Sequence, residues 1–335
     1  MALLGDPWML GTVEVPNRVL LAPLAGIGNW FVRLQAKRYG AGMAVSEMVS
    51  SHAVHHGNRR TCEELLRIHP AERKTGPVSI QLFGQDPEIM RSAAATVAAA
   101  GADVIDINMG CPVPKVCKTG AGAALIGDPD RAVAVARAAR EGSGLPVTVK
   151  LRSGQRPGES TGVQLARRLV EEAGVAAIGF HPRCAAVGHK GAPDYALAEE
   201  LVSSLGAPVI LTGAMNEPDG IREAFTSTGV EAVMLARGCL GDPWLFARVL
   251  GKRESEPSTE EVLSELEWVI DAAVEHIGSE RSVGYLRKFY PWYVRRLGLD
   301  PAAAKTLQES LQAAATLEQV RTQLGNHRHS VVLAA

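Results

Sequence analysis

Short apolar runs alternate with longer amphipathic or alanine-rich segments along most of the chain. The apolar runs have the length and continuity of strands that are buried on both faces of a sheet. They cover residues 19–22, 43–45, 78–81, 104–107, 147–150, 177–180, 209–211 and 232–235. Segments that predict helices cover residues 88–100, 129–140, 162–173, 196–205 and 217–227. Asp128 is a good N-cap for the second of these helices, and Pro218 suits the first turn of the last.

Eight strand–helix units of this kind predict an α/β protein built on a closed parallel (β/α)8 TIM barrel. A doubly wound sheet is the main alternative. It usually has fewer strands, and its dinucleotide-binding form would place G-x-G-x-x-G after an early strand. The sequence holds only the fragment Gly120-Ala121-Gly122. The pattern therefore favours the barrel.

The composition changes after the last strand–helix unit. Residues 251–258 form a short charged stretch that indicates a linker. Ser258 and Glu261 then make a capping box in front of apolar residues at helical spacing. Further helices follow, and Pro291 should kink or break one of them. We expect a barrel domain over residues 1–250 and a small C-terminal helical bundle domain over residues 259–325.

The most informative segment joins the run at residues 104–107 to the turn that follows it. This segment reads Asn-Met-Gly-Cys-Pro-Val-Pro-Lys from Asn108 to Lys115. A cysteine just past the carboxyl end of a parallel strand can point into the mouth of a barrel, where active sites lie. Asn108, Pro112 and Lys115 around Cys111 indicate a loop built for chemistry. The alternative is that Cys111 is a small buried hydrophobe, and the spacing alone leaves both interpretations open.

Other predicted strand ends also carry polar or glycine-rich groups. Gln81, Lys150 and His181 follow or close buried strands, where a purely structural barrel has no need for them. A lysine at such a place costs desolvation unless it meets an anion or open solvent. A surface lysine whose stem lies along the barrel is the alternative. The last two strands end in glycine-containing loops, where Gly213 and Arg237 suit a phosphate site, although tight turns are the simpler role for glycine.

Composition narrows the classes of protein that fit. The 335 residues carry a formal net charge of −1, so any RNA site has to be a local basic patch. The cysteines are odd in number and scattered, which argues against a disulfide framework and predicts a reducing, cytoplasmic setting. They are Cys62, Cys111, Cys117, Cys184 and Cys239. With no signal peptide or bilayer-length apolar run in view, we expect a soluble protein without a membrane partner.

Three histidines at helical spacing are the one hint of a metal. They are His52, His55 and His56. No acidic or thiol partner lies in the same motif, and a metal site needs a full ligand set. We therefore predict no metal site.

Three motifs resemble those of the tRNA-dihydrouridine synthases, flavin enzymes with a (β/α)8 barrel and a C-terminal helical domain. The similarity runs from about Asn17 to Leu297. The motifs are Ala22-Pro23-Leu24-Ala25-Gly26; Ile107-Asn108-Met109-Gly110-Cys111-Pro112 with Lys115-Val116; and Ala236-Arg237-Gly238 before Pro243-Trp244. The middle motif is highly specific, and the first is shared with other FMN barrels. The segment from Lys288 to Tyr293 is similar to one in the bacterial B-type branch of the family.

The resemblance implies an oxidoreductase that uses FMN and NADPH to reduce specific uridines in tRNA to 5,6-dihydrouridine. Flavin N5 would deliver a hydride to C6 of a uracil taken out of its stack. Cys111 would protonate C5, since a thiol is mostly protonated at neutral pH. The residues implied in FMN binding are Pro23, Leu24, Ala25, Gln81, Asn108, Lys150, His181, Thr212, Gly213, Ala214, Ala236 and Arg237. Basic groups that would contact substrate or RNA are Lys115, Arg183, Arg287, Lys288 and Arg295, for which a solvated surface is the ordinary alternative.

Two strand ends depart from the family pattern. The family usually has Asn-Gly-Asp where this chain has Thr212-Gly213-Ala214, which removes an amide and an acid beside the implied phosphate. The Thr212 hydroxyl could replace part of that contact. Farther back, the family tends to have His-Gly-Arg-Thr where this chain has His181-Pro182-Arg183-Cys184, and Pro182 removes one N–H.

These features leave two other hypotheses open. The first motif and the near-neutral charge permit a different FMN-barrel reductase, acting on a small enone or a free pyrimidine. The altered loop at residues 212–214 permits an RNA-binding protein that has lost its flavin. For the main hypothesis we expect tRNA and NADPH as partners of a cytoplasmic monomer.

Overall fold

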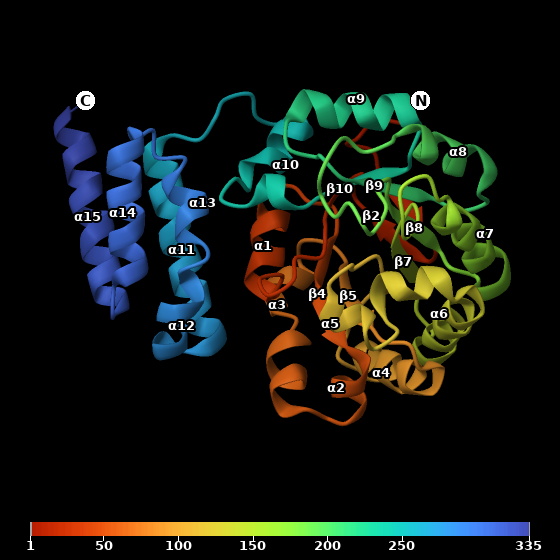
Figure 1. The fold of residues 1–335 in the computed structure, drawn as a ribbon. Coiled ribbons are helices and arrows are strands. Elements are labelled where there is room, and N and C mark those ends of the chain that lie inside the picture. The colour runs from red at the N-terminus through yellow and green to blue at the C-terminus, as the bar shows by residue number, and fades with distance from the viewer. Residues whose placement is uncertain (1, 335) are drawn as a thin grey trace. The chain divides into compact units, whose positions relative to one another are not determined.

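The computed structural model describes residues 2–334, and the chain divides into two compact units (Figure 1). The first unit runs to Gly238 and also includes Val249–Lys252. The second comprises Cys239–Arg248 and the chain from Arg253 onward. The domain ranges expected from the sequence, 1–250 and 259–325, stay a prediction; the division by contacts differs from them in grouping residues 239–248 with the second unit.

Eight parallel strands of the first unit close into a barrel in the order β10-β3-β4-β5-β6-β7-β8-β9. The (β/α)8 barrel predicted from the sequence is thereby confirmed. The strands are β3 (Val19–Leu21), β4 (Ala44–Ser50), β5 (Val78–Phe83), β6 (Val104–Met109), β7 (Val147–Arg152), β8 (Ala177–His181), β9 (Val209–Thr212) and β10 (Ala232–Leu235). The sheet has no free edge because β10 pairs with both β9 and β3.

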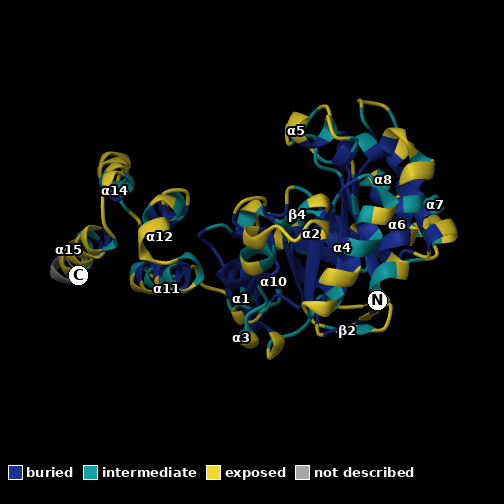
Figure 2. Cartoon of the chain, turned by 90° about the horizontal axis from the view of Figure 1, so that it is seen from below, coloured by how far each residue is buried: buried dark blue, intermediate teal, exposed yellow. Residues whose placement is uncertain are grey.

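Helices surround this barrel (Figure 1). They are α1 (Trp30–Arg38), α2 (Ser51–His55), α3 (Pro70–Arg73), α4 (Pro87–Ala99), α5 (Pro114–Cys117), α6 (Pro129–Ser143), α7 (Thr161–Ala173), α8 (Ala196–Ser204) and α9 (Pro218–Thr228). Short 3-10 or π segments are η1 (Thr61–Leu65), η2 (Gly122–Gly127) and η3 (Arg237–Cys239). The predicted N-cap is confirmed, since the Asp128 carboxylate accepts a hydrogen bond from Arg131 N at 3.2 Å. Figure 2 shows buried residues along the strands and exposed residues on the outer faces of the helices.

A short antiparallel hairpin, β1 (Trp8–Leu10) and β2 (Val13–Val15), precedes the barrel. Its apolar side chains Trp8, Leu10 and Val15 pack in one core cluster with residues that begin three barrel strands, Val104, Ala177 and Ala232. The hairpin therefore covers the amino-terminal end of the barrel and leaves the carboxyl-terminal end for a site. The sequence pattern does not reveal these strands, because three residues are too few to show an alternation.

Several strands run further than their apolar cores predicted. Strand β6 continues to Met109 and so includes Asn108, and β7 continues to Arg152. Asn108 pairs in register with Lys150, and Lys150 with Gly179. Polar side chains at these strand ends are thus mounted on the rigid sheet and not on the loops.

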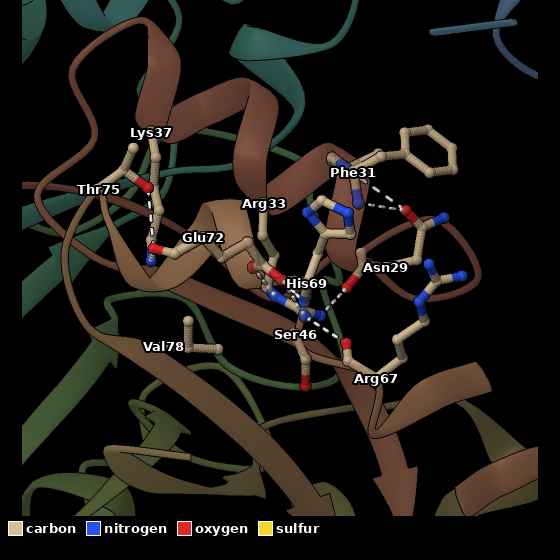
Figure 3. Close-up of polar contacts among 12 residues, drawn as sticks. Asn29, Phe31, Arg33, Lys37, Ser46, Arg67, His69, Glu72, Thr75 and Val78 are labelled. Atoms are coloured by element: carbon tan, nitrogen blue, oxygen red, sulfur yellow. Dashed lines mark hydrogen bonds and ion pairs between the residues drawn. The ribbon is translucent and has the colours of Figure 1, made fainter. Parts of the chain in front are cut away.

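A buried ion pair connects α1 with α3 (Figure 3). The Arg33 guanidinium donates to both carboxylate oxygens of Glu72, at 2.8 and 3.0 Å, and both side chains are completely buried. Arg33 also donates to the carbonyl oxygens of Gly28 (3.2 Å) and Arg67 (2.9 Å). The pair therefore holds the loop after β3 and the loop after η1 in place.

Lys37 completes this group, which we call the Arg33 network (Arg33, Lys37 and Glu72). Its ammonium donates to the carbonyl oxygens of Glu72 (3.1 Å) and Gly76 (2.7 Å). Burial lowers the pKa of Lys37 to about 8, although the charge of Glu72 acts against this. The cations and the carboxylate of the Arg33 network are thus tied to each other and to the backbone.

The second unit is helical. Its elements are α10 (Trp244–Val249, the last residue grouped with the barrel), α11 (Thr259–Ile277), α12 (Ser279–Leu286), α13 (Tyr290–Val294), α14 (Pro301–Ala313) and α15 (Leu317–Ala334). The predicted capping box is confirmed, because Ser258 Oγ accepts from Glu261 N and the Glu261 carboxylate accepts from Ser258 N. The predicted break is also confirmed, since Pro291 lies in the first turn of α13, after α12 has ended. Within residues 2–334, no helix combines the length and apolar character that a membrane span requires.

Candidate active site

The loop after β6 carries Cys111 in a defined backbone conformation. Asn108 Oδ1 accepts hydrogen bonds from Gly110 N at 3.2 Å and from Cys111 N at 2.9 Å. The Cys111 carbonyl accepts from Ala123 N at 3.0 Å. Gly122 has φ +63° and lies so close that an added Cβ would be 2.7 Å from that carbonyl oxygen. Cys111 itself is half-buried, so its thiol is neither packed away in the core nor fully in solvent.

A chain of hydrogen bonds runs from Asn108 into the barrel. Asn108 Nδ2 donates to Gln81 Oε1 at 2.9 Å, and Gln81 Nε2 donates to Asp106 Oδ2 at 2.6 Å. The other carboxylate oxygen of Asp106 accepts from Thr148 Oγ1 at 2.5 Å. Burial raises the pKa of Asp106 to about 6, against the opposing effect of these two donors and of the Lys150 charge.

Next to this chain lies a group that we call the cation cluster: Lys150, Arg152 and Arg183. Arg152 donates to the carbonyl oxygens of Gly110 (2.9 Å), Cys184 (3.2 Å) and Gly188 (2.7 Å). Arg183 donates twice to the carbonyl oxygen of Gly191, at 3.1 and 2.7 Å. Within residues 2–334, none of the three cations forms an ion pair with a carboxylate.

The pKa values around the cation cluster indicate a site of positive potential. Burial, and after it the charge of Arg152, lowers the pKa of Lys150 to about 8. Burial and then Arg183 lower the pKa of Arg152. His181 is almost completely buried, and its pKa falls to about 2 through burial and then the charges of the cluster. Such a group of poorly compensated charges is suited to an anionic ligand.

His181 is held as a neutral imidazole. Arg183 Nη1 lies 3.1 Å from His181 Nε2, and because a guanidinium can only donate, that ring nitrogen accepts and the proton is on Nδ1. The ring of His189 lies 5.7 Å from that of His181, in a stacked orientation. Desolvation, and after it the charge of Arg237, lowers the pKa of His189 to about 4.

The loop after β9 approaches His181 closely. Gly213 has φ +117°, and a Cβ on it would be 2.7 Å from His181 Cδ2, so only glycine fits. Its carbonyl oxygen accepts from the Tyr195 hydroxyl at 3.0 Å. Ala214 has φ 58° and is the one non-glycine residue with positive φ among residues 2–334. The Thr212 hydroxyl donates to Met234 O at 3.0 Å, so its proton is already used on the neighbouring strand.

The remaining candidate cofactor residues lie on the loops after β3 and β10. Pro23 is half-buried, Leu24 is buried and Ala25 is exposed. After β10, Ala236 is half-buried and Arg237 is exposed at the start of η3. All of the residues expected to bind FMN thus lie in the carboxyl-terminal halves of barrel strands or just beyond them.

The basic residues expected to contact RNA fall into two groups. Lys115 is exposed on α5, whereas Arg183 is buried in the cation cluster and bonded to Gly191 O. The others belong to the second unit, where Arg287, Lys288 and Arg295 are exposed. The Lys288 ammonium lies 3.9 Å from the ring centroid of Tyr285.

Sequence reasoning missed four polar side chains of this site. Asp106, Thr148, Arg152 and Tyr195 were not singled out. A signal existed for the first two, since polar residues at 79 and 81, 106 and 108, and 148 and 150 alternate with apolar ones, as side chains on one face of a strand do. Within residues 2–334, no group of three or more His, Cys, Asp or Glu side chains is placed to hold a metal ion.

Two solved structures illustrate the shared architecture. Morphinone reductase superposes with a TM-score of 0.56 at 17% identity, over 77% of this chain and 92% of that one. A variant of NCR from Zymomonas mobilis gives a TM-score of 0.57 at 18% identity, over 78% of this chain and 96% of that one. At these identities the likeness concerns the fold alone.

Sequence relatives are closer. The chain is 34% identical over 298 residues to tRNA-dihydrouridine synthase B of Pseudomonas aeruginosa, a match that covers 86% of this chain and 87% of that protein. It is 33% identical over 311 residues to probable tRNA-dihydrouridine synthase 1 of Synechocystis sp., covering 91% and 84%. The family model described as dihydrouridine synthase (Dus) matches residues 20–330. The chain therefore belongs to the dihydrouridine synthase family, in agreement with the motif around Cys111.

Proposed function

We propose that this protein reduces uridines in tRNA to 5,6-dihydrouridine, with FMN as its cofactor, NADPH as the reductant and Cys111 as the proton donor. Membership of the family makes the chain an oxidoreductase enzyme. The observation that carries the finer proposal is the half-buried Cys111, held by Asn108 next to the cation cluster, which lacks a carboxylate partner within residues 2–334.

The residues present fit an anionic flavin nucleotide. Lys150 and Arg152 supply positive charge in a buried place, which favours an anionic ring system or phosphate. Gly213 leaves room beside His181 that any Cβ would fill. Arg237 is exposed and begins a short helical turn, as suits a phosphate contact. The family's acid and amide are absent at 212–214, so we expect the phosphate to depend on Arg237 and backbone N–H groups.

Each side chain has a definite task in the proposed reaction. The bound flavin would supply the hydride. Cys111 would hold the proton that C5 of the uracil receives, and Asn108 would keep the Cys111 backbone in place. Lys150 would favour negative charge next to it. His181 would act only through its neutral form, since its burial and then the cations around it lower its pKa far below neutral pH.

RNA binding would rest on local basic groups and not on the net charge. Lys115 on α5 and the exposed Arg287, Lys288 and Arg295 of the second unit are the candidates. Contacts of this kind go to phosphates, so each one lost should weaken binding for all tRNA sequences and reduce the salt dependence of the affinity.

The decisive experiment compares two cysteine variants. Deleting the gene should remove a dihydrouridine from tRNA, measured by mass spectrometry, and the purified protein should be yellow. Wild type should restore the modification in the deletion strain. Cys111→Ala should lower the rate of uridine reduction about 100-fold or more, because general acid catalysis contributes about 10²–10⁴-fold. Cys62→Ala is the matched control, since Cys62 is also half-buried but lies on η1.

Three results would contradict the proposal. Full activity of Cys111→Ala would remove the proton-donor role. Rapid NADPH-dependent turnover of a small enone or free pyrimidine, with no change in tRNA, would favour the other FMN-barrel reductase. A colourless protein that nevertheless binds tRNA would favour a binding protein without flavin.

A further inference from the structure

Asp106 is a buried carboxylate to which the proposed reaction gives no task. It lies two residues before Asn108 on β6, so the two side chains point to the same side of the strand. Its side chain is almost completely buried and forms no ion pair among residues 2–334. Burying a carboxylate at such a place costs free energy unless hydrogen-bond donors satisfy its oxygens.

The hydrogen bonds of Asp106 have a fixed direction. An ionised carboxylate can only accept, and its two oxygens accept from Thr148 Oγ1 and Gln81 Nε2. With its amino group turned to Asp106, Gln81 must present its oxygen to Asn108. Asn108 then turns its own amino group to Gln81 and its oxygen to the N–H groups of Gly110 and Cys111.

The shape of the two amides does not by itself fix this orientation. Gln81 and Asn108 each have a donor and an acceptor end of nearly the same shape, and a chain of two amides could run in either direction. In the reverse direction, Asn108 would present its amino group to the N–H of Cys111, and that N–H would have no acceptor. The charge at the buried end and the two N–H groups at the loop end therefore favour the same direction, and the charge stabilises the bonds that hold the Cys111 loop.

We propose that Asp106 is a positioning residue: its carboxylate sets the direction of the Asp106–Gln81–Asn108 chain and thereby fixes the backbone of the loop that carries Cys111. This inference rests on the proposed function only for the role of Cys111 as the proton donor. The hold on the loop is a property of the protein that can be measured without turnover.

The structure also shows what keeps Asp106 ionised. Thr148, Gln81 and the charge of Lys150 all favour the carboxylate, whereas burial opposes it. An isosteric amide at position 106 would lose this direction, because an amide could accept from Gln81 or donate to it.

A charge swap tests the inference. In Asp106→Asn, the new amide can accept from Gln81 or donate to it, so the direction of the chain should be lost. Adding Gln81→Glu restores one negative charge to the pair. The amide at position 106 can then donate to the new carboxylate at position 81, which accepts from Asn108 Nδ2. The control variant is Asp103→Asn, which removes the same charge from a carboxylate that accepts from Val78 N, at 2.8 Å, and lies outside the chain.

The readouts are deuterium uptake of the peptide that contains the Gly110 and Cys111 N–H groups, and the alkylation rate of Cys111 relative to Cys62. Asp106→Asn should raise the exchange rate of that peptide about ten-fold, as expected for losing a hydrogen bond. Asp106→Asn/Gln81→Glu should return it to within about two-fold of wild type, and Asp103→Asn should leave it unchanged.

Either of two outcomes would overturn the inference: wild-type exchange in Asp106→Asn, or equal exchange in Asp106→Asn and Asp106→Asn/Gln81→Glu. If the single variant does not fold, recovery of a folded, protected loop in the double variant supports the inference, and failure of the double variant overturns it. Failure of the proposed function would be visible elsewhere, as wild-type protein that forms no dihydrouridine.

Discussion

The first unit buries two groups of charged side chains, and they are built in opposite ways. In the Arg33 network, Arg33 meets a carboxylate through two hydrogen bonds, and Lys37 donates to the backbone around that same residue, Glu72. In the cation cluster, the two arginines donate to backbone carbonyl oxygens, as Arg152 does to Gly110 O. Burial lowers the pKa of Lys150, and the charge of Asp106 is the main effect that raises it.

The difference separates a structural from a functional use of buried charge. In a matched ion pair each charge compensates the other, so removing one partner should lower the free energy of unfolding. A group with excess positive charge is destabilising until an anion arrives, so its removal should affect binding. The following predictions test this contrast, from the largest expected effect to the smallest.

Glu72→Gln should destabilise the protein most. It leaves the completely buried Arg33 without its counter-charge, which typically costs about 3–5 kcal/mol of the free energy of unfolding. Chemical denaturation measures the change. Glu63→Gln is the control, because its pair with Arg59 is exposed and should contribute less than about 1 kcal/mol. Equal losses in the two variants would erase the contrast.

Lys150→Met, in contrast, should not destabilise the unliganded protein. Removing a half-buried cation without a carboxylate partner within residues 2–334 should leave the free energy of unfolding unchanged or raise it by about 1 kcal/mol. FMN affinity should instead fall about 10–100-fold, as for a lost hydrogen bond to a charged group. Flavin titration and denaturation without flavin give the two numbers. A large loss of stability would place Lys150 with Arg33 as a structural residue.

The pH dependence of FMN binding should follow the Lys150 ammonium. Its pKa is lowered to about 8 by burial, so the charge is present below that pH and lost above it. FMN affinity should fall as the pH rises through about 8, and Lys150→Arg should abolish this fall. Between about 8 and the ordinary lysine pKa, the unfolded chain binds more protons, so the contribution of Lys150 to stability rises with pH. A flat affinity profile in wild type would contradict the assignment.

Ala214→Gly should have the smallest effect, and a stabilising one. Ala214 has φ 58°, where an L side chain costs about 1–2 kcal/mol, and glycine loses part of that gain through its greater freedom when unfolded. We expect a net rise of about 0.5 kcal/mol in the free energy of unfolding. Ala186 is an exposed loop residue without a positive φ. Ala186→Gly should therefore lower the free energy of unfolding slightly. Opposite signs for the two variants would assign backbone strain to Ala214 at the candidate site and not to Ala186.

The architecture could be predicted from the sequence because each barrel strand is a short apolar run and neighbouring runs are separated by a helical segment. The polar residues at strand ends were visible for the same reason, since Gln81, Lys150 and His181 interrupt or end such runs. Asp106 was missed because it lies inside an apolar run, where only the alternation with Asn108 marks it.

The Arg33 network lay beyond any pattern in the sequence. Arg33 and Glu72 are 39 residues apart, and nothing local connects them. Helix α1 has buried residues on all sides, from Trp30 to Lys37, so it shows no polar stripe against which a buried arginine would stand out. Only the tertiary structure reveals that the charge is paired.

Two glycines leave room for Lys150 and His181 at the candidate site. A methyl group at Gly179 would lie 3.3 Å from Lys150 Cγ, and one at Gly213 would collide with the His181 ring. Both glycines contribute to the site because they have no side chain. Anyone transplanting this arrangement of charges into another barrel scaffold would have to copy the two hollows together with the lysine and the histidine, because the same side chains on a fuller sheet would be forced to point elsewhere.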